Sequence, residues 1–275
     1  MSLGSTIPPL ECTGARPLRS QLVETLREQI ARWEKARRPQ ETPVSSGSKA
    51  LDRLLPAGGF HRGTLVEWLA AGDGSGAETL ALLAAREACL SSFFDNLGSL
   101  VVLDRSGEFY PPAAVRLGIE PQGLIVVRVA NEADHAWALD QALRCPAVAA
   151  VVARPDRLEA KTFRRLQLAA EQGGTLGLLV RPEQVRHEPS WADVRLFVQP
   201  SESGKRKAES GKTTLRPTRR FPLSAFRFLL QVQLLRSRGG ASGGSVEVEI
   251  GDETRTVHLA PQLARPAARR RAAGA

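Results

Sequence analysis

Long apolar segments are missing from this sequence. No apolar run approaches the roughly 18 residues that a membrane-spanning helix requires. The first 30 residues also lack the basic start and the apolar stretch of a secretory signal. We therefore expect a cytoplasmic protein with no membrane partner.

Cysteine and histidine are too few and too scattered to indicate a metal site or a disulfide framework. The three cysteines include no CxxC pair, and no two of the four histidines have the spacing that places both on one helix face. We predict no metal and no disulfide. The residues concerned are Cys12, Cys89, Cys145, His61, His135, His187 and His258.

Aromatic residues make up only 5% of the chain, and none lies within its basic runs. A platform on which the bases of a single strand stack is therefore poorly supported. The sequence also lacks a GxSxG motif, so nothing indicates a catalytic nucleophile. We predict no catalytic residue.

Two segments carry the formal net charge of +9. Residues 200–220 hold seven Lys or Arg and two Glu, a balance of +5, and four arginines after Ala264 add +4. The rest of the chain is balanced. Such basic segments attract nucleic-acid phosphates without reading sequence; the structural alternative is a solvated linker and a solubilising tail.

Both ends of the chain are predicted to lie outside the core. Residues 1–15, rich in Pro, Gly and Thr, and the basic tail at 263–275 are predicted to be disordered. Residues 16–43 are predicted to form an amphipathic helix and a linker, because apolar residues recur every three or four positions from Leu18 to Trp33 and prolines follow.

Residues 44–199 alternate between apolar strands and helices. Strands without internal alternation, each followed by a helix, indicate an α/β domain with a mostly parallel sheet and helices on both faces. We predict strands at 64–69, 99–104, 124–130, 147–153 and 175–181, and helices at 78–94, 111–118, 131–144 and 157–174.

The pattern changes after Trp191. Short apolar segments separated by turns, beginning with 191–200, predict an antiparallel extension of the sheet, most of it within 219–262. A basic flexible loop at 200–218 interrupts this extension.

The stretch AAGDGSGAETLALL joins the first strand to its helix, which is where a phosphate-binding P-loop lies. Aligning Gly76 with the last glycine of that motif places Ala77 at the lysine position and Glu78 at the magnesium-binding hydroxyl. A carboxylate at a helix N-terminus repels a nucleotide anion. We predict that Gly72, Gly74 and Gly76 form a tight turn and that no nucleotide cofactor is bound.

A GKT tripeptide at 211–213 matches the end of a P-loop motif. No apolar strand precedes it, and Pro217 follows before any helical pattern. Because the motif binds phosphate only between a strand and a helix, we predict that this copy does not bind ATP.

The segment SSGSKALDRLLPAGGFHRGTLVEWLAAGDGSGAETLAL resembles the start of the RecA recombinase core, where a Ser/Thr-Gly-Ser lead precedes the first strand and the phosphate loop. The similarity continues through LDRSGEFYPPAAVRLGI and LIVVRVANEADHAWALDQALR and covers residues 44–182. With RLQLAAEQGGTLGLLVRP and the turn in LLRSRGGASGG, the chain most resembles ImuA, a family of short RecA-like proteins.

This resemblance implies where an ATPase would hold its other groups. In the RecA family an acidic residue after the second strand activates water; the matching position is Ser106, with Glu108 two residues further on. A magnesium-directing Asp would end the fourth strand, where Ala153 or Arg154 stands and Asp156 comes late. The resemblance therefore implies a RecA-like fold without hydrolytic residues.

The ImuA resemblance also implies a role in the bacterial SOS response, in translesion synthesis. The implied partners are an ImuB-like polymerase homologue and an error-prone replicative polymerase, with DNA or RecA as further candidates. Basic residues near the DNA-facing region of a RecA-like fold are candidate phosphate contacts, although those on the helix have a solvated helix face as their alternative. These residues are Arg164, Arg165, Arg181, Lys205, Arg206 and Lys207.

Three functions stay open from the sequence. The first is a non-hydrolysing RecA-like scaffold in DNA damage tolerance, which binds partners through its N-terminal helix and its C-terminal sheet edge. The second is a weak ATPase or recombinase in which Lys49, Arg105 or a partner's residue supplies the missing charge. The third is a non-specific DNA-binding protein that acts through its basic loop and tail.

Overall fold

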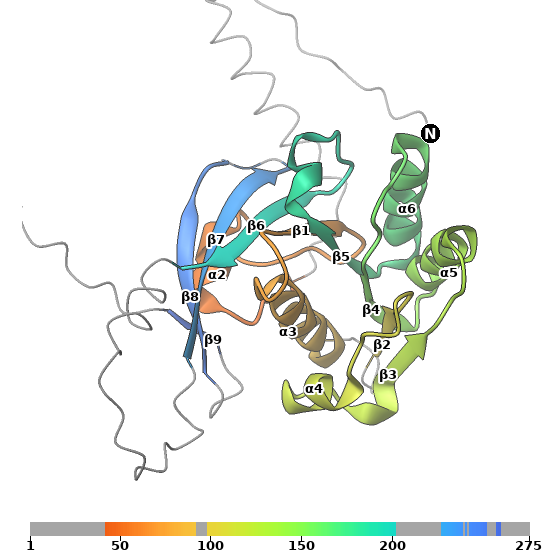
Figure 1. Ribbon diagram of the computed structural model, residues 1–275, viewed down its shortest axis with the longest axis horizontal. Coiled ribbons are helices and arrows are strands. Elements are labelled where there is room, and N and C mark those ends of the chain that lie inside the picture. The colour runs from red at the N-terminus through yellow and green to blue at the C-terminus, as the bar shows by residue number, and fades with distance from the viewer. Residues whose placement is uncertain are drawn as a thin grey trace, which may run out of the picture. The chain divides into compact units, whose positions relative to one another are not determined.

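Figure 1 shows the computed structural model of the chain. The structure describes residues 42–91, 98–201, 227–238, 240, 242–251 and 257–259. The predicted disordered N-terminus, the N-terminal helix, the GKT tripeptide, nearly all of the basic loop and the basic tail lie outside the described residues.

Within the described residues, nine strands form one mixed sheet. They are β1 (Leu65–Ala70), β2 (Ser99–Leu103), β3 (Leu124–Val127), β4 (Val148–Ala153), β5 (Leu176–Pro182), β6 (Val194–Pro200), β7 (Arg227–Ser237), β8 (Ser245–Gly251) and β9 (Val257–Leu259). Their order across the sheet is β3-β2-β4-β5-β1-β6-β7-β8-β9.

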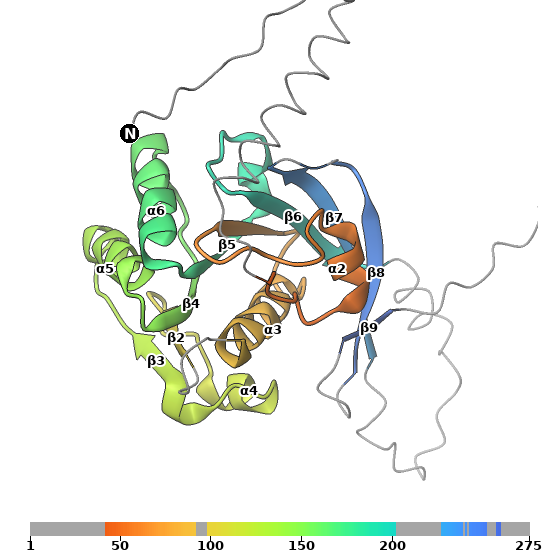
Figure 2. The same cartoon turned by 180° about the vertical axis from the view of Figure 1, so that it is seen from behind.

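The α-helices are α2 (Lys49–Leu54), α3 (Ala77–Leu90), α4 (Pro111–Arg116), α5 (Glu132–Arg144) and α6 (Ala160–Gly173), with 3-10 helices η1 (Pro121–Gly123) and η2 (Glu183–His187). Seen from behind, α5 and α6 lie toward one end of the sheet and β7 to β9 toward the other (Figure 2). No helix among the described residues is long and apolar enough to cross a membrane.

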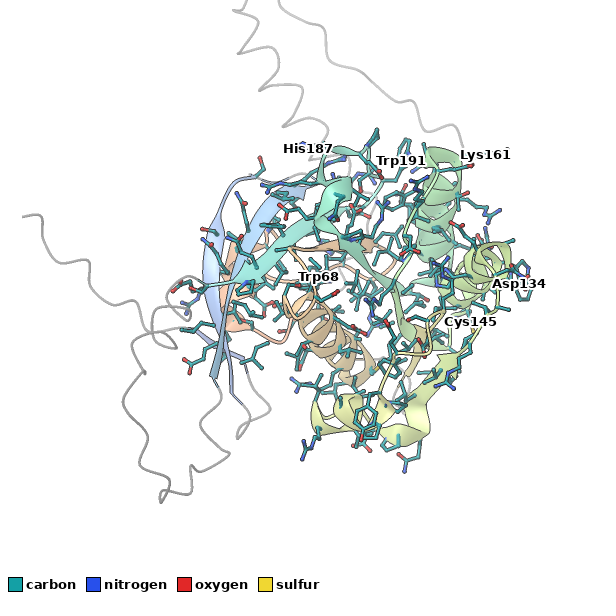
Figure 3. All side chains as sticks on the ribbon, in the orientation of Figure 1. Trp68, Asp134, Cys145, Lys161, His187 and Trp191 are labelled. Atoms are coloured by element: carbon teal, nitrogen blue, oxygen red, sulfur yellow. The ribbon has the colours of Figure 1, made fainter. Side chains whose placement is uncertain are left out.

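Alternate side chains of β1 build a core on each face of the sheet. Val66 and Trp68 pack in the cluster that contains the buried residues of α3, and Trp68 lies deep in the molecule (Figure 3). Leu65 packs with the buried residues of α5 and α6 on the other face, and Leu69 packs with Val185 of η2. The strand is therefore apolar along nearly its whole length, as a strand buried on both faces requires.

The predicted α/β class is confirmed, with a mostly parallel sheet, helices on both faces and antiparallel C-terminal strands. One strand differs from the prediction, because β6 does not begin the antiparallel extension. It runs parallel to β1, with Trp68 beside Leu196, and only β7 turns antiparallel, with Leu234 beside Leu196. Because β5 and β6 both run parallel to β1, the chain must return from the carboxyl end of β5 to the amino end of β6. The segment from Glu183 to Asp193 is long enough to make this connection.

The lead before β1 forms a small polar cluster that sequence reasoning did not foresee. Asp52 accepts hydrogen bonds from Ser45 Oγ at 2.7 Å and from the Ser46 backbone N–H and Oγ at 2.8 and 2.6 Å. The side chain of Ser48 caps α2 by accepting from the Leu51 N–H. These hydrogen bonds therefore fix the conformation of the segment that leads into β1.

Candidate functional site at the carboxyl edge of the sheet

The glycine turn after β1 is packed against the C-terminal part of the sheet. Gly74 and Gly76 have φ of +71° and +83°, in the left-handed region that favours glycine, and Gly76 is the N-cap of α3. A Cβ atom at Gly76 would lie 2.4 Å from Cδ1 of Leu230 on β7. An apolar side chain from a distant strand therefore covers the end of the loop.

Ala77, at the position of the P-loop lysine, is 1% exposed and belongs to the same apolar cluster as Leu230. This cluster is hydrophobic, so the position offers packing and no charge. A lysine ammonium here would lose its hydration without gaining an ionic partner.

Glu78 replaces the magnesium-binding hydroxyl and pairs with an arginine. Arg154 Nη1, just after β4, lies 3.7 Å from Glu78 Oε2 and 3.2 Å from Glu108 Oε2. A guanidinium thus occupies the strand end at which a magnesium-directing aspartate would stand. We call these three side chains, Glu78, Arg154 and Glu108, the outer cluster.

The residues present do not fit a magnesium–nucleotide complex. The space between Glu78, Asp104 and Arg154 is about 10 Å³, at the lower limit for a single water molecule. Its polar walls are the carboxylates of Glu78 and Asp104 and the guanidinium of Arg154. A carboxylate at the helix N-terminus repels a phosphate, and a guanidinium repels a magnesium ion.

The acidic residue that directly follows β2, Asp104, makes its contacts within the protein. Asp104 is buried, and its Oδ1 accepts the Glu108 backbone N–H at 3.1 Å, while its Oδ2 lies 3.5 Å from Nε of Arg128. Ser106, at the position expected for a water-activating carboxylate, donates its hydroxyl to Glu108 at 3.0 Å. Glu108 therefore contacts both Ser106 and Arg154.

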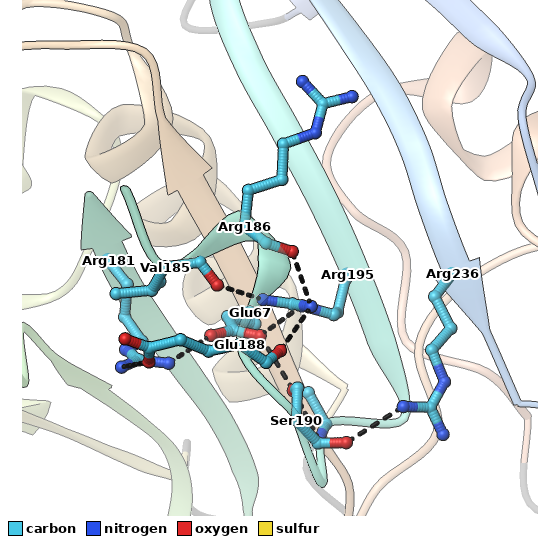
Figure 4. Close-up of polar contacts among 9 residues, drawn as sticks. Glu67, Arg181, Val185, Arg186, Glu188, Ser190, Arg195 and Arg236 are labelled. Carbon is cyan, nitrogen blue, oxygen red and sulfur yellow. Dashed lines mark hydrogen bonds and ion pairs between the residues drawn. The ribbon is translucent and has the colours of Figure 1, made fainter. Parts of the chain in front are cut away.

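A second group of charges lies in the interior, where Figure 4 shows Glu67, Arg181 and Arg195 beside one another. Glu67 of β1 is fully buried, and its two oxygens lie 2.7 Å from Nη1 of Arg181 and 2.6 Å from Nε of Arg195. Ser190 donates its hydroxyl to Glu67 at 2.8 Å. We call Glu67, Arg181 and Arg195 the inner cluster.

The inner cluster holds the η2 segment against the sheet. Arg195 donates to the backbone carbonyls of Val185, Arg186 and Glu188 at 3.0 to 3.2 Å. Arg181, a predicted phosphate contact, is 1% exposed and has no surface on which to meet a phosphate. The signal for this arrangement was the glutamate inside the apolar run TLVEWL, since a buried charge requires a partner.

The other predicted nucleic-acid contacts lie in different places. The Arg164 guanidinium stacks 4.9 Å from the ring centroid of Trp191, which lies between α6 and the η2 segment (Figure 3). Arg165 faces α5, where its Nε is 3.4 Å from Asp140. The structure does not bring these two together with Arg181, and Lys205, Arg206 and Lys207 lie outside the described residues.

Other reactive groups are not assembled into a reactive site. Burial raises the pKa of the Cys89 thiol to about 11, against the opposing positive charge of Arg62, so this thiol stays protonated at neutral pH. In the part of the chain that the structure describes, no group of three His, Cys, Asp or Glu side chains is placed to hold a metal ion.

Comparison with known proteins finds both sequence relatives and solved structures that are similar to this chain. The chain is 30% identical over 240 residues to the protein ImuA of Caulobacter vibrioides, in strains NA1000 / CB15N and ATCC 19089, with 81% of this chain and 91% of the relative covered. A crystal structure of the RadB recombinase matches with a TM-score of 0.56 and 17% identity, over 79% of this chain and 99% of that chain. No family model matches the chain.

Proposed function

The chain belongs to the ImuA family and has a RecA-like fold, and from this premise we propose that it is a non-hydrolysing accessory protein that acts as a scaffold in DNA damage tolerance. Its setting is SOS mutagenesis and translesion synthesis in the cytoplasm. Its partners are an ImuB-like polymerase homologue and an error-prone replicative polymerase. DNA and RecA are further candidates for contact.

One observation carries the proposal: Arg154 stands between Glu78 and Glu108 at the carboxyl edge, beside a buried Ala77. Phosphoryl transfer depends on positive charge that neutralises the transferred group and on a carboxylate that orients the nucleophile. Here the lysine position is apolar, and the carboxylates are paired with a guanidinium. The fold therefore keeps its surfaces for partners while the chemistry of ATP hydrolysis is missing.

The first experiment measures phosphate release from ATP by the purified full chain, with and without magnesium. We expect no turnover above the buffer blank. Magnesium-dependent turnover would contradict the proposal and favour the weak ATPase. Arg105 already pairs with Asp156, which leaves it less available to supply the missing charge.

The second experiment tests the scaffold role by co-purification of the full chain with an ImuB-like protein. We expect a stable complex that survives moderate salt, because a scaffold must hold its partner through specific packing. A chain lacking residues 1–40 tests the predicted contact through the N-terminal helix. Failure of the full chain to bind would contradict the scaffold role itself.

The location of the basic charge supports a second function, non-specific DNA binding. The +5 of residues 200–220 and the +4 after Ala264 together equal the net charge of the chain. Binding through these segments should weaken steeply with salt and be lost when residues 200–218 and the tail are deleted. Binding that survived the deletion at moderate salt would exclude this function.

A further inference from the structure

A polar groove of about 310 Å³ lies between the first turns of α5 and α6. Glu132 and His135 line it from α5, Arg105 from the connection after β2, and Asp156 and Arg157 from the connection after β4. In open α/β sheets, ligands bind outside the carboxyl ends of the strands, which is where this groove lies. It shares Arg154 with the outer cluster but contains no residue of the glycine turn.

His135, which lines this groove, carries an unpaired ring nitrogen. The side chain is 4% exposed, and its buried Nε2 has no hydrogen-bond partner among the described residues. Burial is the largest cause that lowers the pKa of His135, and the positive charge of Arg105 adds to it, against Asp156 and Glu132. A buried polar atom without a partner is rare in folded proteins and indicates a missing ligand or water.

The charges around the groove favour one anionic group. Arg105 is paired with Asp156, but exposed Arg157 has no ion-pair partner among the described residues. The α6 N-terminus adds positive potential, since its N-cap Glu159 makes no side-chain capping bond and its first turn holds no acidic residue. Glu132 and Glu159 also line the groove, but Arg154 lines it too, so its arginines and carboxylates balance and the α6 N-terminus adds the positive excess.

We propose that this groove binds a single phosphate monoester, the 5′-phosphate of a nucleotide or of a DNA strand, which accepts a hydrogen bond from His135 Nε2–H and an ion pair from Arg157. The volume lies at the lower end of small-ligand clefts, roughly 300–1,000 Å³, and holds a phosphate with its adjoining sugar. This binding activity goes beyond the scaffold function and does not depend on it.

The test follows the ring resonances of His135 by NMR in the full chain, labelled at histidine. The probes are inorganic phosphate, a nucleoside 5′-monophosphate, and one short DNA strand with either a 5′-phosphate or a 5′-hydroxyl. We expect saturable shifts of His135 with the phosphorylated probes and none with the 5′-hydroxyl strand. The pKa of His135 should rise on binding, because a phosphate dianion stabilises the imidazolium.

The relative affinities identify the source of the phosphate. Tighter binding of the 5′-phosphorylated strand than of the mononucleotide assigns the groove to a strand end, and the reverse order assigns it to a free nucleotide. Equal shifts with the 5′-hydroxyl strand, or no shift with any phosphate, would overturn the proposal. Neither result bears on ATP turnover or on co-purification, so the two proposals fail separately.

Two matched arginine variants complete the test. Arg157→Ala should weaken phosphate binding about tenfold, as expected for one lost charge-assisted contact, and the fold should be retained because the side chain is exposed. Arg116→Ala removes an exposed arginine from α4, outside the groove, and should leave the affinity unchanged. Equal affinities for these two variants would also overturn the proposal.

Discussion

The inner and outer clusters are built from the same side chains, arginine and glutamate, but differ in exposure. In the inner cluster Glu67 and Arg181 are 0% and 1% exposed. In the outer cluster the side chains of Glu78, Arg154 and Glu108 are 37%, 47% and 66% exposed. The same kind of ion pair therefore lies in the protein interior in one cluster and largely in water in the other.

This difference separates a structural role from a functional one. In the interior, an arginine without its carboxylate would be an unpaired charge in a medium of low dielectric, so the pairs of the inner cluster are obligatory. At the surface, water screens each charge, and the outer cluster contributes little to stability. The outer cluster instead sets the charges beside the glycine turn, where Arg154 lies between two carboxylates.

The largest expected effect comes from breaking the inner cluster. Glu67→Ala leaves Arg181 and Arg195 buried without their carboxylate and should lower the free energy of unfolding by about 3–5 kcal/mol. Urea denaturation followed by circular dichroism measures the change. Glu108→Ala in the outer cluster is the matched control, with an expected change within about 0.5 kcal/mol. Similar losses for both variants would remove the distinction between the clusters.

The next largest loss of stability is expected from removing the side chain of Leu230, which packs against the glycine turn. Leu230 is 3% exposed and contacts the turn that precedes Glu78, so Leu230→Ala should cost about 2–4 kcal/mol through the cavity it leaves. Thermal or urea unfolding measures it. Leu168→Ala, at a leucine that is 45% exposed, should change stability by less than about 0.5 kcal/mol. An equally small effect at Leu230 would show that the turn does not depend on β7.

His135 is buried like Glu67, but its Nε2 has no partner among the described residues. Its contribution to the free energy of unfolding therefore depends on pH. Its pKa in the folded chain is lowered from the ordinary value of 6.5, so the unfolded chain binds this proton at higher pH. The free energy of unfolding should therefore fall as pH drops below that ordinary value, until the folded pKa is reached. Urea midpoints at about pH 7.5 and about pH 5.5 measure the fall.

The matched variant for this pH dependence is His135→Gln, which keeps a polar side chain that does not titrate. The urea midpoint of this variant should fall less between these two pH values. Arg105, Asp156 and Glu132 are unchanged in it, so their own charges are the same in both proteins. An identical fall in both proteins would assign the pH dependence to other groups.

The smallest effect is expected from Arg154→Ala. Its two ion pairs are partly exposed, so the free energy of unfolding should change by less than about 1 kcal/mol, and less still at high salt. Denaturation in low and high salt measures it. A loss above about 2 kcal/mol would mean that the outer cluster is as essential to folding as the inner one.

The sequence predicted the structure best where the pattern of neighbouring residues is enough to define a strand, a helix or a turn. The unbroken apolar strands and the helices between them predicted the α/β core, and each strand or helix predicted within residues 44–199 overlaps one that the structure describes. The glycine stretch predicted a turn without a phosphate-binding lysine, because residue type alone shows the absence of an ammonium. Local pattern did not predict the direction of β6, since that strand is equally apolar whichever way its neighbour runs.

The candidate sites required distances between residues far apart in the chain. Glu67 and Arg181 are separated by 114 positions, and Arg154 and Glu108 by 46. A glutamate within an apolar strand indicates that some partner exists, but not which of the many arginines it is. The groove at His135 leaves no sequence signal, because its lining comes from α5, α6 and the connections after β2 and β4.

By itself, the sequence determined that this protein has an α/β core with a mostly parallel sheet, and that Ala77 stands where a P-loop has its lysine. Both follow from residue type and short-range spacing. Only the tertiary structure decided which charges are buried as pairs, which remain in water, and where Leu230 covers the glycine turn. The physical reason is that burial and pairing depend on how strands and helices meet in space, whereas propensity and periodicity act between near neighbours.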